Sequence, residues 1–320
     1  MKRFSVIFMI AALAMSGRAA ELADTMTTEV STPTQPTMIA KKPLTIDASI
    51  GARTGGDYHI DRHGETVEYG HGSAMMKSQL KASGTLFRKG FSRIDASAGY
   101  TNYLHKMEGR ELRLYDYGID EQTHHNVTLG LSATTYLRLM GKPLMIMASG
   151  NTTFSEFGYE RWSASVMTLL MLKNTKEVTF GVGLLGLIHS SARIPVYPMI
   201  TYRQVLSPEW TINCVMPRFH VEYKLSEDDM LSAGFIIDVD SYFSESDDER
   251  LPERMNYCRT NVNIGPAYEH RFSYGLILRA ETGAQWVVAD RMYKNRNNHI
   301  EGRVHEKTAP YLKVGVIWKM

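Results

Sequence analysis

Apolar and polar residues alternate with a period of two through most of this chain after its first 43 residues. In residues 126–138, Val127, Leu129 and Leu131 fall on one parity, and Thr128 falls on the other. Successive side chains of a β-strand point to opposite faces, so this pattern predicts strands with one apolar face and one polar face. The same alternation recurs in segments of about 8–15 residues, which indicates an all-β fold.

Three features favour a transmembrane β-barrel over a soluble two-layer sheet. Charged residues lie in the middle of the predicted strands, and many segments are long enough for a tilted bilayer span. Short and long connections also alternate, as in outer-membrane barrels. The short ones are residues 88–90, 140–143, 173–176, 207–209, 226–229 and 269–272, and the long ones are 53–72, 104–122, 242–256 and 289–304. No apolar run after the first 20 residues reaches the length of a membrane-spanning helix.

We expect about fourteen antiparallel strands, or twelve if the short hairpin around Pro217 does not span the membrane. The expected strands are 44–52, 73–87, 91–103, 123–138, 144–153, 162–172, 177–188, 195–206, 210–217, 218–225, 230–241, 257–269, 273–288 and 305–320. Aromatic residues near the strand ends are typical of interfacial girdles. They are Tyr100, Tyr103, Trp162, Tyr202, Trp210, Tyr223, Tyr257, Tyr268, Trp286 and Trp318.

The first 43 residues differ in character from the barrel region, residues 44–320. Residues 1–20 have a basic start, an apolar stretch and small residues before a cut after Ala19, as in a secretory signal peptide. Residues 21–43 are rich in threonine and proline, so we expect a periplasmic linker or a partial plug of the lumen. The predicted location is therefore the bacterial outer membrane.

Composition excludes several classes of function. Three of the 36 basic residues leave with the signal peptide, so the mature chain is nearly neutral against 34 acidic residues and gives no electrostatic case for nucleic-acid binding. Cys214 and Cys258 have no partner at metal-ligand spacing, so no zinc site is predicted. Whether they pair in a single disulfide stays open. We expect no metal and no cofactor.

The stretch from Ile194 to Gly234 carries a modestly specific set of short motifs. It contains Pro195-Val196-Tyr197-Pro198, Ser207-Pro208-Glu209-Trp210, Pro217 and Tyr223-Lys224-Leu225-Ser226. With these motifs the chain resembles an uncharacterised outer-membrane β-barrel family of Bacteroidota. The resemblance implies the barrel fold and the outer-membrane location, and it implies no catalytic residue.

The polar parity of the predicted strands carries the residues expected to line the lumen. These are Lys77, Lys81, Arg93, Asp95, Arg138, Arg203, Glu222, Lys224, Arg259, Arg279, Glu281 and Lys313, with Asp238 on the same parity. A basic lumen would favour anionic solutes. Alternatively the charges pair as struts across the lumen, for example Arg93 with Asp95 or Arg279 with Glu281. A barrel of fourteen strands is too wide for side chains alone to fill.

Other candidate sites have simpler explanations. His189 and Ser191 have a spacing seen in outer-membrane lipid hydrolases, but no third orienting group is evident, so rim residues beside a loop are the favoured interpretation. The acidic run at residues 245–249 matches no calcium-loop spacing. His124 and His125 are adjacent on a strand, so they face opposite sides and cannot share one metal.

We therefore predict a non-enzymatic channel or transporter for small solutes, anionic or amphipathic. The alternative is a surface binding or structural protein that acts through loops such as 104–122 and 289–304. A lipid hydrolase using His189 and Ser191 is the third hypothesis. Expected partners are outer-membrane lipid and lipopolysaccharide, the barrel-assembly machinery and a small solute, with no nucleic acid.

Overall fold

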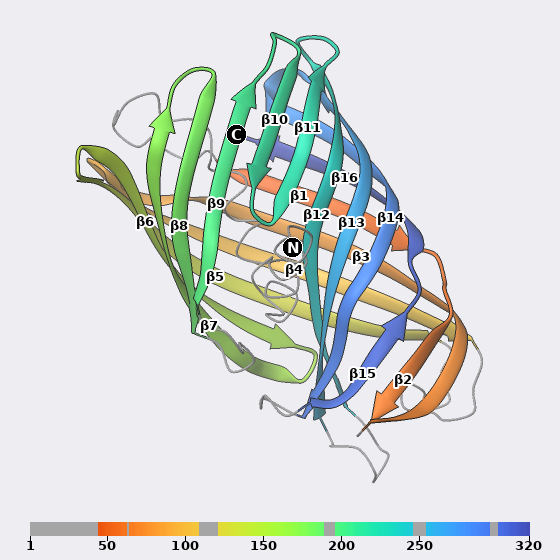
Figure 1. The fold of residues 1–320 in the computed structure, drawn as a ribbon. Coiled ribbons are helices and arrows are strands. Elements are labelled where there is room, and N and C mark those ends of the chain that lie inside the picture. Colours follow the sequence, from red (N-terminus) through yellow and green to blue (C-terminus); the bar gives the residue numbers. More distant parts are fainter. Residues whose placement is uncertain (1–43, 63, 109–120, 189–195, 246–253, 295–299) are drawn as a thin grey trace, which may run out of the picture.

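A computed structural model describes residues 44–62, 64–108, 121–188, 196–245, 254–294 and 300–320. They form a closed antiparallel barrel of fourteen strands, whose first and last strands are each interrupted once (Figure 1). The bounds are β1 Thr45–Arg53, β2 Tyr58–Arg62, β3 Glu65–Lys89, β4 Ser92–Glu108, β5 Glu121–Leu139, β6 Lys142–Ser155, β7 Gly158–Asn174, β8 Val178–Ile188, β9 Val196–Val205, β10 Trp210–Val215, β11 Arg218–Lys224, β12 Asp229–Glu245, β13 Arg254–Arg271, β14 Leu276–Lys294, β15 Ile300–Glu306 and β16 Ala309–Lys319.

The barrel closes where its first strand meets its last. β1 and β2 lie end to end along β3, and β15 and β16 lie end to end along β14. β1 pairs with β16 over nine residue pairs, and β2 pairs with β15 over four. The pairings run around the whole ring, so along their paired lengths the strand backbones satisfy one another's hydrogen bonds, as a lipid-exposed sheet requires. No helix in the described residues is long and apolar enough to cross a membrane.

The predicted alternation of outward apolar residues is confirmed. Along β5, Val127, Leu129, Leu131 and Leu137 are exposed, whereas Thr134 on the other parity is buried. β16 repeats the pattern, with its apolar parity exposed at Leu312, Val314, Val316 and Trp318. Two of the predicted girdle residues are wrong: Tyr103 and Tyr257 are buried inside the barrel, because each lies on the inward parity of its strand.

Six connections of two to four residues lie at one end of the barrel, which we call the short-turn end. β5 and β6 are joined there by Met140 and Gly141, whose φ angles are 52° and 74°. Positive φ at both central residues is the geometry of a type I′ turn, whose twist matches that of the flanking strands. Gly141 adopts this conformation at no steric cost, whereas Met140 does so against its preference.

At the opposite end, which we call the long-connection end, the strands extend further than predicted. Much of the predicted loop 53–72 consists of β2 and the start of β3, and much of 289–304 belongs to β14 and β15. The many polar side chains of these segments predicted loops. Where β2 pairs with β15, however, the outward side chains are polar and the inward ones, such as Ile60 and Val304, are apolar. The hairpin β10–β11 is short, as expected, and it completes the count of fourteen strands.

A charge on the outward face should destabilise the barrel. Leu131→Arg places a guanidinium near the middle of the outward apolar residues of β5, so we expect a loss of about 2–4 kcal/mol in unfolding free energy. Urea titration in phospholipid vesicles measures it. The control is Ser132→Arg, which faces inward at the level of Asp95 and should change stability by less than about 1 kcal/mol. Equal losses would contradict the assigned faces.

Candidate lumen and its closure

The wall of the barrel is interrupted beside the hairpin β10–β11. β9 pairs with β10 only from Thr201 onward, and β11 pairs with β12 only as far as Ile236. Toward the long-connection end, the described residues of β12 pair with β13 alone. β9 and β12 diverge in this region, as Figure 1 shows.

Beyond that point β12 and β13 are buried on both faces. Residues 239–243 of β12 and 255–263 of β13 are all buried, whereas residues 229–236 of β12 are mostly exposed or half-buried. We call residues 237–243 and 255–263 the inward segment. Burial of both parities means that neither face of this segment is directed at solvent or lipid.

One face of the inward segment contacts the wall formed by β3, β4 and β5. The Tyr242 ring lies 4.7 Å from the His105 ring, 4.8 Å from the His124 ring and 5.5 Å from the Tyr103 ring, measured between centroids. Tyr242 also stacks on Tyr257, its partner across the strand pair. β12 and β5 belong to opposite walls of a fourteen-stranded ring, so these contacts cross the lumen.

The other face of the inward segment contacts the wall formed by β6 to β9. The Arg161 guanidinium of β7 donates a hydrogen bond of 2.7 Å to the hydroxyl of Ser241 and lies over the Phe243 ring. From β5, the neighbour of β6, the Asn126 side chain also donates a hydrogen bond of 2.5 Å to the main-chain oxygen of Ser241. Ile237 also packs among apolar residues of β6 to β9. The inward segment thus lies between the two walls and fills the interior at the long-connection end.

The inner surface of β6 to β9 is apolar and rich in methionine. We call this set the Met-rich face: Met145, Met147, Met167, Leu169, Met171, Leu185, Leu187, Tyr197 and Met199, with Met216 at the tip of the β10–β11 hairpin. Methionine is unbranched and polarisable, so such a surface can adapt to apolar groups of different shapes. Sequence reasoning missed this face, although the alternating methionines of 145–147 and 167–171 were a visible signal.

The opposite part of the interior is polar and contains a cavity of about 140 Å³. Its charged lining comprises Lys77, Lys81, Lys313, Asp47, Asp238 and Glu281. Cations and carboxylates balance here, which differs from the basic lumen expected. The difference arises because carboxylates of β1, β12 and β14 reach the same space as the lysines of β3 and β16.

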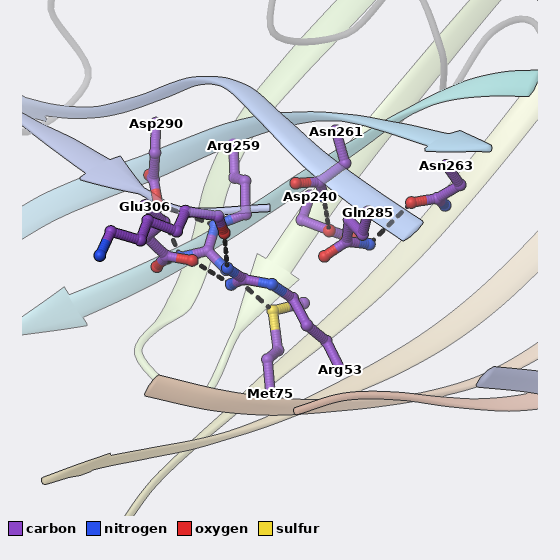
Figure 2. Close-up of polar contacts among 10 residues, drawn as sticks. Arg53, Met75, Asp240, Arg259, Asn261, Asn263, Gln285, Asp290 and Glu306 are labelled. Atoms are coloured by element: carbon purple, nitrogen blue, oxygen red, sulfur yellow. Dashed lines mark hydrogen bonds and ion pairs between the residues drawn. The ribbon is translucent and has the colours of Figure 1, made fainter. Parts of the chain in front are cut away.

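Lys77 joins the inward segment to the β3 wall. Its ammonium lies 2.6 Å from a carboxylate oxygen of Asp240 and 3.2 Å from one of Asp238, both on β12. Asn261 on β13 donates a second hydrogen bond of 2.7 Å to Asp240. Figure 2 shows Asp240 and Asn261 together, beside the bonded pair Gln285 and Asn263.

A buried cluster of two arginines and two carboxylates lies nearer the long-connection end (Figure 2). We call Arg53, Arg259, Asp290 and Glu306 the Arg259 cluster. Arg259 donates to Asp290 at 2.7 Å and is paired with Glu306, which also pairs with Arg53. The side chains of all four are at most 3% exposed, so the charges are balanced within the protein rather than by water. The sequence assigned Asp290 and the segment before residue 305 to a loop, so this cluster was not foreseen.

The structure places most of the predicted lumen residues on the inward parity. Lys77, Lys81, Glu281 and Lys313 line the polar cavity, and Arg259 lies deep in its cluster. Arg138 and Lys224 lie on the inward parity but are exposed at the short-turn end. Arg203 and Glu222 lie near each other on β9 and β11, where His220 hydrogen-bonds to Glu222 at 2.8 Å.

The predicted struts form, but with a different geometry. Arg93 pairs with Asp95 at 2.8 Å and Arg279 with Glu281 at 2.6 Å. Each pair joins residues i and i+2 on one face of one strand, so it stays on one wall. Lys77, in contrast, pairs across the interior with Asp238 and Asp240 of β12.

The structure describes some of the remaining candidate residues from the sequence and leaves others outside the described ranges. His124 faces inward onto Tyr242, whereas His125 hydrogen-bonds to Tyr100 at 2.7 Å on the exposed side, as predicted. No disulfide joins Cys214 and Cys258 in the described part of the chain. His189, Ser191, the acidic run after Glu245 and residues 1–43 lie outside the described residues. So do the centres of loops 104–122 and 289–304.

The sequence matches no model of a known protein family and no curated protein. Solved outer-membrane barrels match the structure. An outer membrane channel from Pseudomonas putida F1 is 9% identical, with a TM-score of 0.44 over 88% of this chain and 97% of that one. A FadL homologue from Pseudomonas aeruginosa is 6% identical, with a TM-score of 0.32 over 87% and 90%. Outer membrane phospholipase A from Escherichia coli is 12% identical, with a TM-score of 0.34 over 88% and 99%. The fold assignment rests on the strand pairings of this chain, which form a closed antiparallel β-barrel of fourteen strands.

Proposed function

We propose that this protein is a non-enzymatic outer-membrane channel for small amphipathic solutes. The observation that carries the proposal is the division of the interior into a Met-rich face on β6 to β9 and a charged cavity against β1, β3 and β16. A solute with an apolar part and a charged group would find a complementary surface for each. The proposal places the short-turn end in the periplasm and the other end among lipopolysaccharide, after insertion by the barrel-assembly machinery.

In this conformation the inward segment fills the space that such a solute would cross. Its contacts with both walls are ion pairs, hydrogen bonds and ring contacts. We therefore propose a closed state and an open state, which differ in the position of this segment. A solute that binds better to the open state would shift the balance toward it.

The selectivity test compares membrane-impermeant ions that differ only in their apolar part. Benzenesulfonate is compared with methanesulfonate, and benzyltrimethylammonium with tetramethylammonium, by flux into proteoliposomes. The protein used is Lys77→Glu, because that substitution removes the ion pairs between β3 and β12. We expect the aromatic ion of each pair to pass faster.

Replacing Met147, Met167 and Met199 together by glutamine should remove this preference. The three side chains are buried in the Met-rich face, and apolar recognition of this size contributes about a tenfold or larger discrimination. The control is Met140→Gln, which lies in the exposed β5–β6 turn. Equal flux of the two ions in each pair through the starting protein would refute the amphipathic preference.

A further inference from the structure

Three side chains of metal-binding type gather on the outside of the barrel where its first and last strands meet. His59 and His305 are direct partners in the pairing of β2 with β15, and Asp61 lies two residues along β2 on the same face. Ile60 and Val304, on the other parity, are buried inside. The alternation of the two strands therefore directs the two imidazoles and the carboxylate to the outer surface.

The three groups are close enough to bind one ion. The imidazole rings are stacked, with centroids 4.6 Å apart and planes 10° apart. Nε2 of His305 lies 3.1 Å from Oδ2 of Asp61, and one ligand atom from each residue lies within 4.8 Å of the others. Tetrahedral zinc with bonds near 2 Å separates its ligand atoms by about 3.3 Å. Small side-chain rotations would bring the ligands to that spacing.

A further group orients the carboxylate. The Thr66 hydroxyl donates a hydrogen bond of 2.7 Å to Oδ1 of Asp61, which leaves Oδ2 directed toward His305. Metal-binding side chains in proteins are regularly oriented by a hydrogen bond from another residue.

We propose that His59, Asp61 and His305 bind a divalent transition-metal ion, Zn²⁺ in the first instance. Two imidazoles and one carboxylate suit zinc, copper or nickel, and the fourth position is left to water. His305 and Asp61 are half-exposed, so an ion can reach them from solution. The bound ion joins β2 to β15, which are otherwise held by four residue pairs. This site is independent of whether the barrel conducts.

The test uses the mature chain without an affinity tag, folded in detergent and freed of metal. Zn²⁺ is titrated by calorimetry, and Co²⁺ is added separately to read the visible absorption of a bound ion. We expect one Zn²⁺ per chain, and a weakening of at least about tenfold in His59→Ala and in His305→Ala. His125→Ala is the matched control, because it removes an exposed histidine that is paired with a tyrosine instead.

Folding of each variant is checked by its heat-dependent migration in gels. If an alanine variant does not fold, Asp61→Asn keeps the shape of the side chain and should give the same loss of affinity. Wild-type protein that takes up no Zn²⁺ overturns the proposal. It is also overturned by folded His59 or His305 variants that bind as tightly as the His125 control.

Discussion

Lys77→Glu is expected to raise the ionic conductance of the barrel by about 100-fold or more. The substitution replaces an ammonium, which holds two carboxylates of β12, by a third carboxylate in the same space. Breaking a buried ion pair costs about 3–5 kcal/mol. If that cost falls on the closed state alone, the open fraction rises by more than two orders of magnitude until it saturates. Single-channel recording in planar bilayers measures the change.

Lys81→Glu provides the matched control for this measurement. Lys81 lies on the same face of β3 and lines the same cavity, so the change of charge is identical. Within the described residues, however, Lys81 forms no ion pair with β12. We expect its conductance to stay near that of the wild type. Equal increases in both variants would show that lumen charge, rather than release of the inward segment, controls conduction. A silent Lys77→Glu barrel that is correctly folded would contradict the proposed closure.

Glu306→Gln is expected to lower the free energy of unfolding by about 3–5 kcal/mol. The substitution keeps the size of the side chain but leaves Arg53 and Arg259 with Asp290 as the one remaining carboxylate of the Arg259 cluster. A buried charge without a counter-charge is the costly outcome, more so than the loss of the pair as a whole. Urea unfolding followed by tryptophan fluorescence measures the loss.

Two further variants test whether the loss in Glu306→Gln comes from unbalanced buried charge. Glu269→Gln removes a half-buried partner of Arg279, which keeps Glu281, so its loss should be under about 1 kcal/mol. Adding Arg53→Met to Glu306→Gln restores the charge balance, because Arg259 and Asp290 remain as a pair. The double variant should therefore be more stable than Glu306→Gln alone. A double variant that is less stable would mean that the charges of this cluster are not coupled.

The strands, and the side of the barrel to which each side chain points, could be predicted from the sequence because both depend on local alternation. Leu131 and Trp318 face outward, and Lys77 and Glu281 inward, simply because parity is preserved along a strand. The path of β12 could not be read in this way. Its residues Ser241 and Tyr242 keep their alternation, yet both parities are buried, since a second wall lies on each side.

β12 turns into the interior because its neighbouring hairpin is short. The hairpin β10–β11 ends near Met216, so the outer half of β12 lacks a partner on that side and takes contacts from β5 and β7 instead. The Arg259 cluster is likewise assembled from four separate strands. Asp290 and Glu306 were placed at or beside a predicted loop because polar residues predominate in that segment of the sequence. The sequence pattern predicts on which face of its strand a residue lies. It does not predict which other strands contact that face.

The pairing of β1 with β16 has a consequence for how the molecule is made. β1 and β16 lie farther apart in the sequence than any other pair of strands in contact, so their pairing carries the largest loop-closure cost. Until β16 arrives, both β1 and β14 present unpaired backbone amides and carbonyls, a state prone to aggregation in water and very unfavourable in lipid. A nascent chain of this kind therefore needs protection until biosynthesis of its final segment is complete.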